Sequence, residues 1–329
     1  MEKKSIMKKI TGSREALLAV ILILLCLVVT AISPSFLTPK SIIELLKNNA
    51  VTLVMSLGML CVMLVGGIDI SIMSTLALSG MSIGMLLKYG HISNTFLAFV
   101  IAIAIGAACG AVVGLVISRA AVPPIIATMG FMYVFRAMGY LVSHGGEWAG
   151  AAALGSFKNF ATSKFLGLNC VIWIIILCYV FFFWFMKWTR TGRKIYAVGS
   201  NPSAAEVSGI NVKNINLLVY TIMGILAGLG GAYVTLATVS QFRPNVIVGQ
   251  GFIAISAVIF GKFTPQGTLK ACLLFGFCNG LKSLLGANNI VSPYLISMIP
   301  YVVTILALIF FVGKSRVPAA NGKPYVKSK

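Results

Sequence analysis

The residue types that most often catalyse reactions or bind metals are few in this sequence. It contains six acidic residues and two histidines among 329 positions. These residues are too scattered to suggest a metal centre or an acid–base pair; they are Glu2, Glu15, Glu44, Asp69, Glu147, Glu206, His91 and His144. The seven cysteines all lie in apolar stretches without a CxxC pair, which is typical of small core residues. The sequence therefore predicts no metal site and no enzyme active site.

The composition excludes a soluble globular protein. Hydrophobic residues make up 59% of the chain and charged residues only 10%, whereas a soluble protein has about 25% charged residues. The net charge of +20 could suggest nucleic-acid binding. Most of the cations, however, lie in short polar segments between apolar runs, where they set the orientation of a chain in the bilayer. We therefore predict an all-α integral membrane protein.

Ten apolar stretches are candidates for transmembrane helices, judged against the roughly 20 residues needed to cross the hydrocarbon core. They are 15–34, 50–66, 71–87, 95–118, 124–143, 168–187, 215–238, 250–261, 267–286 and 294–313. The eighth is short and has glycine or proline at both ends, which indicates a broken or re-entrant helix. The first lacks a small-residue cleavage site, so we expect it to remain as a span.

The distribution of lysine and arginine predicts the orientation. An even number of spans puts both termini on one side, and the terminal segments 1–14 and 314–329 are both basic. With both termini in the cytoplasm, 18 of the 26 cations fall on the inner side and 8 on the outer side, as the positive-inside rule requires. We therefore expect residues 15–313 to form one transmembrane domain between two cytoplasmic basic ends.

Glycines at intervals of four predict close helix packing. Gly106, Gly110 and Gly114 follow this spacing, and so do Gly224 and Gly228. In lipid, small residues let helix backbones approach and supply much of the contact energy. We interpret these glycines as packing seams and not as a cofactor-binding fingerprint, because no strand–turn–helix pattern surrounds them.

One carboxylate lies at the edge of two apolar stretches, in the run from Gly66 to Ser71, which reads GGIDIS. An ionisable residue at such a place is a functional candidate by default. Asp69 either caps the helix that follows it, by accepting backbone N–H groups, or contacts a substrate directly. Together with other polar or aromatic groups on apolar spans, it gives a set of candidate pathway residues: Asp69, Ser71, Thr128, Tyr133, Asn279 and Tyr301.

The longest polar segment expected in the cytoplasm is 189–214. Asn201 followed by Pro202 is a typical helix start, and Gly209 is a typical stop. The pattern predicts a short capped helix over about 202–208. This helix is either a docking element for a partner or a connector without one.

Two further patterns bear on this segment. Ser203 and Glu206 offer an alternative start, since they have the spacing of a capping box. The chain has no phosphate-binding loop of its own, because Gly313-Lys314-Ser315 lacks the first glycine, Leu308 being in its place. If the protein moves a solute uphill, the energy must come from an ion gradient or from a separate subunit. Proton coupling usually requires several Asp, Glu and His residues within the spans. This chain has a single acid there, which favours the separate subunit.

Several segments resemble a known family. The run Val65 to Met81 resembles the GGIDLSVGS motif of permeases in ABC importers for ribose, other monosaccharides and autoinducer-2. The stretches Val122 to Trp148 and Arg190 to Val212 are similar to two further motifs of the same permeases. Ala257 to Thr264 and the tail Gly313 to Tyr325 look more like permeases of purine-nucleoside importers. Ile72 and Met73 depart from the sugar-type motif, which has Val and Gly there.

The resemblance implies a bacterial inner-membrane assembly. It would contain two permease subunits, identical or different, two cytosolic ATPases that bind ATP and Mg²⁺, and an extracytoplasmic solute-binding protein. The permease itself would bind no cofactor and catalyse no covalent chemistry. Carried over by position, the residues expected to couple it to the ATPase are Gly199, Asn201, Pro202, Ala204, Ala205, Glu206, Ser208 and Gly209. The small Ala204 and Ala205 would let the helix approach the ATPase, and Glu206 could pair with a basic group there.

The expected function is thus that of a permease subunit that moves a simple sugar or sugar-like solute by alternating access. The same role for purine nucleosides is the alternative within this family. From other classes, an ion-coupled secondary transporter or a membrane scaffold without transport would fit the apolar composition.

Overall fold

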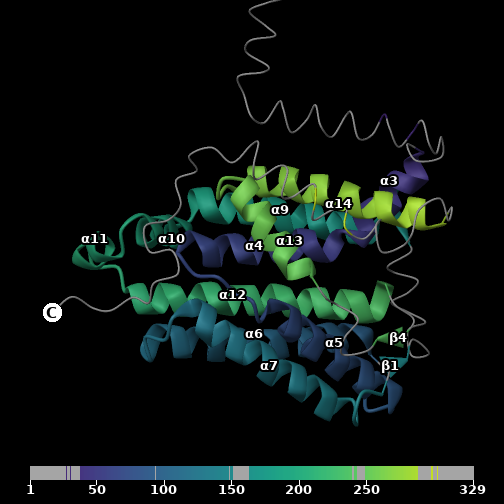
Figure 1. Cartoon of the computed structure of the whole chain (residues 1–329), viewed down its shortest axis with the longest axis horizontal. Helices are drawn as coiled ribbons and strands as arrows, with labels where there is room; N and C mark the ends of the chain where they lie inside the picture. The colour runs from purple at the N-terminus through teal and green to yellow at the C-terminus, as the bar shows by residue number, and fades with distance from the viewer. Residues whose placement is uncertain are drawn as a thin grey trace, which may run out of the picture. The chain divides into compact units, whose positions relative to one another are not determined.

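The computed structural model describes residues 38–92, 94–147, 149–150, 163–238, 241–242 and 249–287, with single residues at 27, 30, 298 and 302. Over these residues the chain forms eleven α-helices and four strands of two residues each (Figure 1). The predicted terminal segments 1–14 and 314–329 lie outside the described residues, and so do the spans 15–34 and 294–313, apart from those single positions.

The helices and strands have the following bounds. They are α3 (Pro39–Asn48), α4 (Ala50–Leu64), α5 (Ile72–Lys88), α6 (Thr95–Arg119), α7 (Pro124–Val142), α9 (Cys170–Trp188), α10 (Arg190–Ser200), α11 (Pro202–Val207), α12 (Val212–Tyr233), α13 (Gln250–Phe260) and α14 (Pro265–Ala287), with β1 (Ala149–Gly150), β2 (Lys164–Phe165), β3 (Leu168–Asn169) and β4 (Gln241–Phe242). A π-helical turn, η3 (Val234–Thr238), extends α12. Each of the eight predicted spans between residues 50 and 286 therefore corresponds to a helix, with its ends moved by a few residues.

The predicted membrane character is confirmed, whereas the number ten stays a prediction. Within the described residues, three helices are long and apolar enough to cross a bilayer, namely α6, α7 and α12. The number rises to five if each of two bent helix pairs counts as one span. Helix α13 has only 11 residues, as expected for the short eighth segment.

The chain divides into two compact units. The first contains residues 1–49 and 273–314, and the second contains 50–272 and 315–329. In the first unit, Gly276 of α14 lies against the Asn49 side chain so closely that a Cβ there would overlap the Asn49 amide. The second unit holds α4 to α13 with the start of α14.

Helix α12 forms the centre of the second unit and packs on α6, α5 and α4 (Figure 1). The contact with α6 is made by backbone. A Cβ at Gly106 would overlap the carbonyl oxygen of Gly224, and a Cβ at Gly110 would overlap that of Tyr220. Because only hydrogen fits at these positions, the prediction that these glycines form packing seams is confirmed. The structure adds that the two runs pack against each other.

Apolar side chains are both inside and outside this unit. All residues of α4 are buried, whereas α6, α7 and α9 carry exposed apolar side chains such as Phe96, Leu141 and Phe181. A water-facing surface of this kind would be unfavourable, but a bilayer is as apolar as these side chains. The outward faces of α6, α7 and α9 therefore fit a lipid environment.

Segments far apart in the sequence meet at each end of the unit. At one end, Arg119 donates a hydrogen bond of 3.0 Å to the Asn214 side chain. At the other end, β1 pairs antiparallel with β4. Helix α11 lies at the end opposite β1 and β4 (Figure 1). The predicted alternation of spans places 119 and 214 on one side, and 149 and 242 on the other.

Two helices were absent from the sequence-based prediction. Helix α3 precedes the second span, and α10 covers residues 190–200 of the predicted polar segment. Both are amphipathic, so a search for long apolar stretches does not detect them. The four short strands are small departures from an all-helical fold.

Candidate functional site

The predicted short helix in the polar segment is confirmed as α11. The side chain of Asn201 accepts a hydrogen bond of 3.1 Å from the Ala204 N–H, and Pro202 is the first helical residue. After the helix, Gly209 has φ +80°, a conformation that glycine adopts without strain. The start at Asn201, and not a capping box from Ser203, therefore defines α11.

The faces of α11 separate the predicted coupling residues into two groups. Ala205 is buried, so it anchors α11 to its own protein instead of meeting a partner. Ala204 and Ser208 are exposed, and Glu206 is half-buried. The Ser208 hydroxyl donates to the Ala204 carbonyl at 2.9 Å.

Val207 is a surface residue that the sequence analysis did not select. It is 90% exposed at the end of α11. An apolar side chain that is exposed on a capped helix outside the long apolar helices suits a protein interface. The sequence contains a signal for this exposed position. Val207 is apolar and follows Ala205 by two positions, so the two side chains lie on different faces of the helix.

Helix α10 connects α11 to the membrane-embedded helices. The Thr189 side chain accepts from the Gly192 N–H at 3.0 Å and starts the helix. The chain bends by 69° between α9 and α10. The buried face of α10 consists of Gly192, Ile195, Val198 and Gly199.

Gly199 belongs to this buried face and so does not face a partner. A Cβ at Gly199 would overlap the carbonyl oxygen of Leu64. Leu64 is the last residue of α4, so the backbone of α10 rests directly on the end of α4.

Asp69 lies in the break between α4 and α5. Its Oδ1 accepts hydrogen bonds from the Ser71 N–H at 2.8 Å and from the Ser71 hydroxyl at 2.6 Å. Helix α5 begins at the next residue, Ile72, so the carboxylate faces the positive end of the helix. Ser71 is the N-cap residue of α5, so Asp69 acts on the start of the helix through Ser71, and its contact with a solute stays a prediction. Asp69 is 3% exposed.

The structure brings three of the six candidate pathway residues together. The Thr128 hydroxyl of α7 donates to the Ile68 carbonyl at 3.2 Å, beside the pair formed by Asp69 and Ser71. All three side chains are buried. They form a polar cluster at the break between α4 and α5, which we call the break cluster.

The other three candidates lie elsewhere. Tyr133 is 61% exposed on α7, and Asn279 is half-buried on the part of α14 that belongs to the first unit. Tyr301 lies outside the described residues.

Tyr220 of α12 is a further polar residue beside the break. A Cβ at Gly67 would overlap its hydroxyl oxygen, and this hydroxyl is buried without a hydrogen-bond partner among the described residues. Tyr220 lies four positions after Asn216, so both are on one face of α12. This repeat of polar residues in an apolar helix is the signal that could have identified it.

The departure from the sugar-type motif at Ile72 and Met73 has a structural counterpart in α13. A Cβ at Gly251 would lie 2.8 Å from Met73 Cγ and 3.1 Å from Ile72 Cγ2. The larger side chains of α5 are thus accommodated by a glycine on α13, and the two helices still approach closely.

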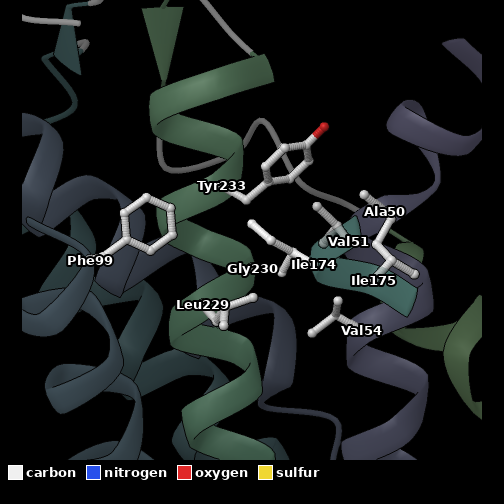
Figure 2. Close-up of a pocket in the computed structure, with 9 residues that line it drawn as sticks. All are labelled: Ala50, Val51, Val54, Phe99, Ile174, Ile175, Leu229, Gly230 and Tyr233. Carbon is white, nitrogen blue, oxygen red and sulfur yellow. The ribbon is translucent and has the colours of Figure 1, made fainter. Parts of the chain in front are cut away.

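A cavity of about 160 Å³ lies among α4, α6, α9 and α12. Figure 2 shows its lining side chains, which are Ala50, Val51, Val54, Phe99, Ile174, Ile175, Leu229, Gly230 and Tyr233. The Tyr233 hydroxyl points away from the other labelled side chains, so the lining is apolar. A sugar needs hydrogen-bonding groups at its site, so this cavity does not have the chemistry of a sugar site.

A second polar group lies at the end of the unit opposite α11. The Tyr89 hydroxyl donates to Glu147 Oε2 at 2.6 Å, and Lys88 Nζ lies 3.3 Å from the same oxygen. The hydrogen bond from Tyr89, followed by that from Lys88, lowers the pKa of Glu147 below its ordinary value. The same contact with Glu147 raises the pKa of Tyr89. This cluster joins the ends of α5 and α7.

Within the described residues, no three His, Cys, Asp or Glu side chains are grouped so that they could hold a metal ion. The polar groups instead occupy the ends of helices. Such an arrangement can position helices, dock a partner and admit a polar solute.

Comparison with known proteins decides the family. Residues 41–308 match the family model described as "Branched-chain amino acid transport system / permease component". The chain belongs to this permease family. It is therefore the membrane permease of an ABC-type importer, a transport subunit and not an enzyme, and it is a multi-pass protein of the bacterial inner membrane.

Individual relatives divide between sugar and nucleoside permeases. The chain is 33% identical to the ribose import permease protein RbsC of Escherichia coli (strain K12) over 299 residues, covering 88% of this chain and 90% of that protein. It is 40% identical to the guanosine ABC transporter permease protein NupQ of Bacillus subtilis (strain 168) over 162 residues, covering 47% and 50%. It is 29% identical to the autoinducer 2 import system permease protein LsrC of Klebsiella pneumoniae over 276 residues, covering 82% and 78%.

Proposed function

We propose that α11 is the element through which this permease receives mechanical work from a separate cytosolic ATPase. The observation that carries this proposal is the capped helix with its exposed Val207 in a chain of this permease family. Two ATPases would bind ATP and Mg²⁺, and the permease would bind no cofactor. Closure of the ATPase pair would move α11 and drive alternating access.

The proposed topology has ten spans with both termini in the cytoplasm. Residues 15–313 would form the transmembrane domain, and 189–214 would be its cytoplasmic coupling segment. The contacts that group Arg119 with Asn214, and β1 with β4, support this alternation. The assembly would contain a second permease subunit, identical or different, and an extracytoplasmic solute-binding protein.

The proposed solute is a simple sugar such as ribose, because the likeness to ribose permeases extends over 88% of the chain. The break cluster supplies the polar groups closest in kind to those that a sugar needs. Purine nucleosides are the second candidate, since the likeness to NupQ reaches 40% over about half of the chain. A nucleoside contains a ribosyl ring, so both solutes would require similar hydrogen-bonding groups.

The docking proposal can be tested with Val207→Asp. A charged side chain in the centre of an apolar contact is expected to weaken binding of the ATPase by about tenfold or more. The matched control is Leu166→Asp, which places the same charge on a residue that is 78% exposed before α9, away from α11. Co-purification of the ATPase should fall for the first variant and stay unchanged for the second. Equal co-purification for both variants would contradict the proposal.

The solute can be identified with the complete importer in lipid vesicles. ATP-dependent uptake of labelled ribose and of labelled guanosine would be compared in the presence of the matching binding protein. Uptake that collapses with the proton gradient and is indifferent to ATP would instead indicate an ion-coupled transporter.

A further inference from the structure

The backbone of α10 meets the end of α4 through a glycine. Gly199 is the last residue but one of α10, and a Cβ there would overlap the Leu64 carbonyl oxygen and lie 2.9 Å from its carbon. Ile195 and Val198 are buried beside it, at 0% and 1% exposure. No flexible side chain separates the two backbones, so α10 cannot shift toward α4 without moving it.

The chain that follows Leu64 leads directly to the break cluster. Gly66 and Gly67 close a turn by donating to the Met63 and Val62 carbonyls at 3.1 and 3.0 Å. Asp69 is five residues after Leu64, and its carboxylate holds the start of α5 through Ser71. A displacement of the end of α4 must therefore change the position of the break cluster.

Tyr220 places a further polar group beside the break. Its hydroxyl is buried beside Gly67 and has no hydrogen-bond partner among the described residues. A buried donor without an acceptor is unfavourable, and such a group in a native protein requires an explanation. Asp69 is a strong acceptor two residues from Gly67, and a movement of the break that brought it to this hydroxyl would supply the missing partner.

We propose that the contact between Gly199 and Leu64 transmits the motion of α11 to the break between α4 and α5, and that the Tyr220 hydroxyl binds Asp69 in the other transport state. This inference rests on the proposed function of α11. Gly199 is a positioning residue, because it acts through α4 and touches no solute. Interfaces between packed backbones are bistable, so a small shift there can select one of two arrangements.

The test measures solute molecules transported per ATP hydrolysed by the complete importer in vesicles. Gly199→Ala adds a methyl group that must lift α10 from α4. Tyr220→Phe adds no atom, and it breaks no hydrogen bond that the structure describes. We expect both variants to bind the ATPase and hydrolyse ATP. The number of solute molecules transported per ATP should fall by roughly tenfold, which corresponds to the loss of one hydrogen bond to a charged group, here the proposed bond from Tyr220 to Asp69. The control is Gly130→Ala on α7, where no atom lies within 4 Å of the added carbon.

The outcomes separate this inference from the proposed function. If the wild-type complex transports solute and the variants transport as much per ATP as the wild type, the inference is overturned and the proposed function stands. A wild-type complex without ATP-driven uptake would overturn both. If Gly199→Ala does not fold, Tyr220→Phe decides the result, since an unchanged ratio for that variant overturns the inference and a lowered ratio supports it.

Discussion

The contact between Gly67 and Tyr220 leads to a prediction that a double-mutant cycle can test. In Gly67→Ala the added Cβ would overlap the Tyr220 hydroxyl and lie 3.0 Å from Val62 Cγ1 and 3.2 Å from Tyr220 Cζ. Overpacking of this kind in a well-packed core costs about 1–3 kcal/mol. Gly67 does not have a positive φ, so the cost would come from the contact and not from the backbone conformation.

The second variant of the cycle removes the atom responsible for the overlap. Tyr220→Phe deletes a buried hydroxyl that has no partner among the described residues, so its effect on folding should be neutral or stabilising by up to about 1 kcal/mol. In the double variant the closest remaining ring contact is the 3.2 Å distance to Cζ. We expect it to recover at least half of the stability lost in Gly67→Ala, which is an interaction energy of about 0.5–2 kcal/mol.

The assay is thermal unfolding of the purified permease in lipid nanodiscs, followed by intrinsic fluorescence. The expected order of midpoints is Gly67→Ala lowest, the double variant intermediate and Tyr220→Phe close to wild type. Gly130→Ala serves as the control, because a helical glycine with no neighbour within 4 Å should tolerate alanine or gain about 1 kcal/mol. Additive effects of the two substitutions would refute the reasoning, since they would show that the hydroxyl does not oppose the new methyl group.

Three further predictions concern other parts of the molecule. Gly110→Ala should lower the thermal midpoint more than Gly67→Ala. Its Cβ would overlap the backbone of α12, which cannot rotate away as a side chain can. An equal or smaller effect would contradict the close backbone contact between α6 and α12. Asn201→Ala removes the cap of α11 and should destabilise that helix by about 1 kcal/mol, measured as weaker binding of the ATPase that Asn201→Ser largely restores. Glu147→Gln should lower the stability of the folded protein at neutral pH but not in acid. The pKa of Glu147 is lowered in the folded protein, so the ionised carboxylate stabilises the fold above its unfolded-state pKa, and this stabilisation disappears as the pH falls through the folded-state pKa. A stability difference between wild type and variant that persists in strong acid would exclude this ion pair as the cause.

Local patterns determined the parts of this protein that depend on neighbouring residues in the sequence. The apolar stretches predicted eight helices between residues 50 and 286, because twenty apolar residues have few stable alternatives in a bilayer. Asn201, Pro202 and Gly209 predicted the position of α11, because caps act within one turn. The interaction of Asp69 with Ser71 is equally local, since the two residues are two positions apart in the sequence.

The tertiary structure decided which residues meet across the chain. The sequence could not show that Gly199 rests on Leu64, 135 positions earlier by their numbers, or that Tyr220 lies beside Gly67. The spacing puts Ala205 and Val207 on different faces of α11, but it could not show which of the two faces packs on the protein and which is exposed. Periodicity identifies a helix and its caps, whereas the rotation and contact partners of that helix depend on packing against distant segments, which is a property of the folded chain.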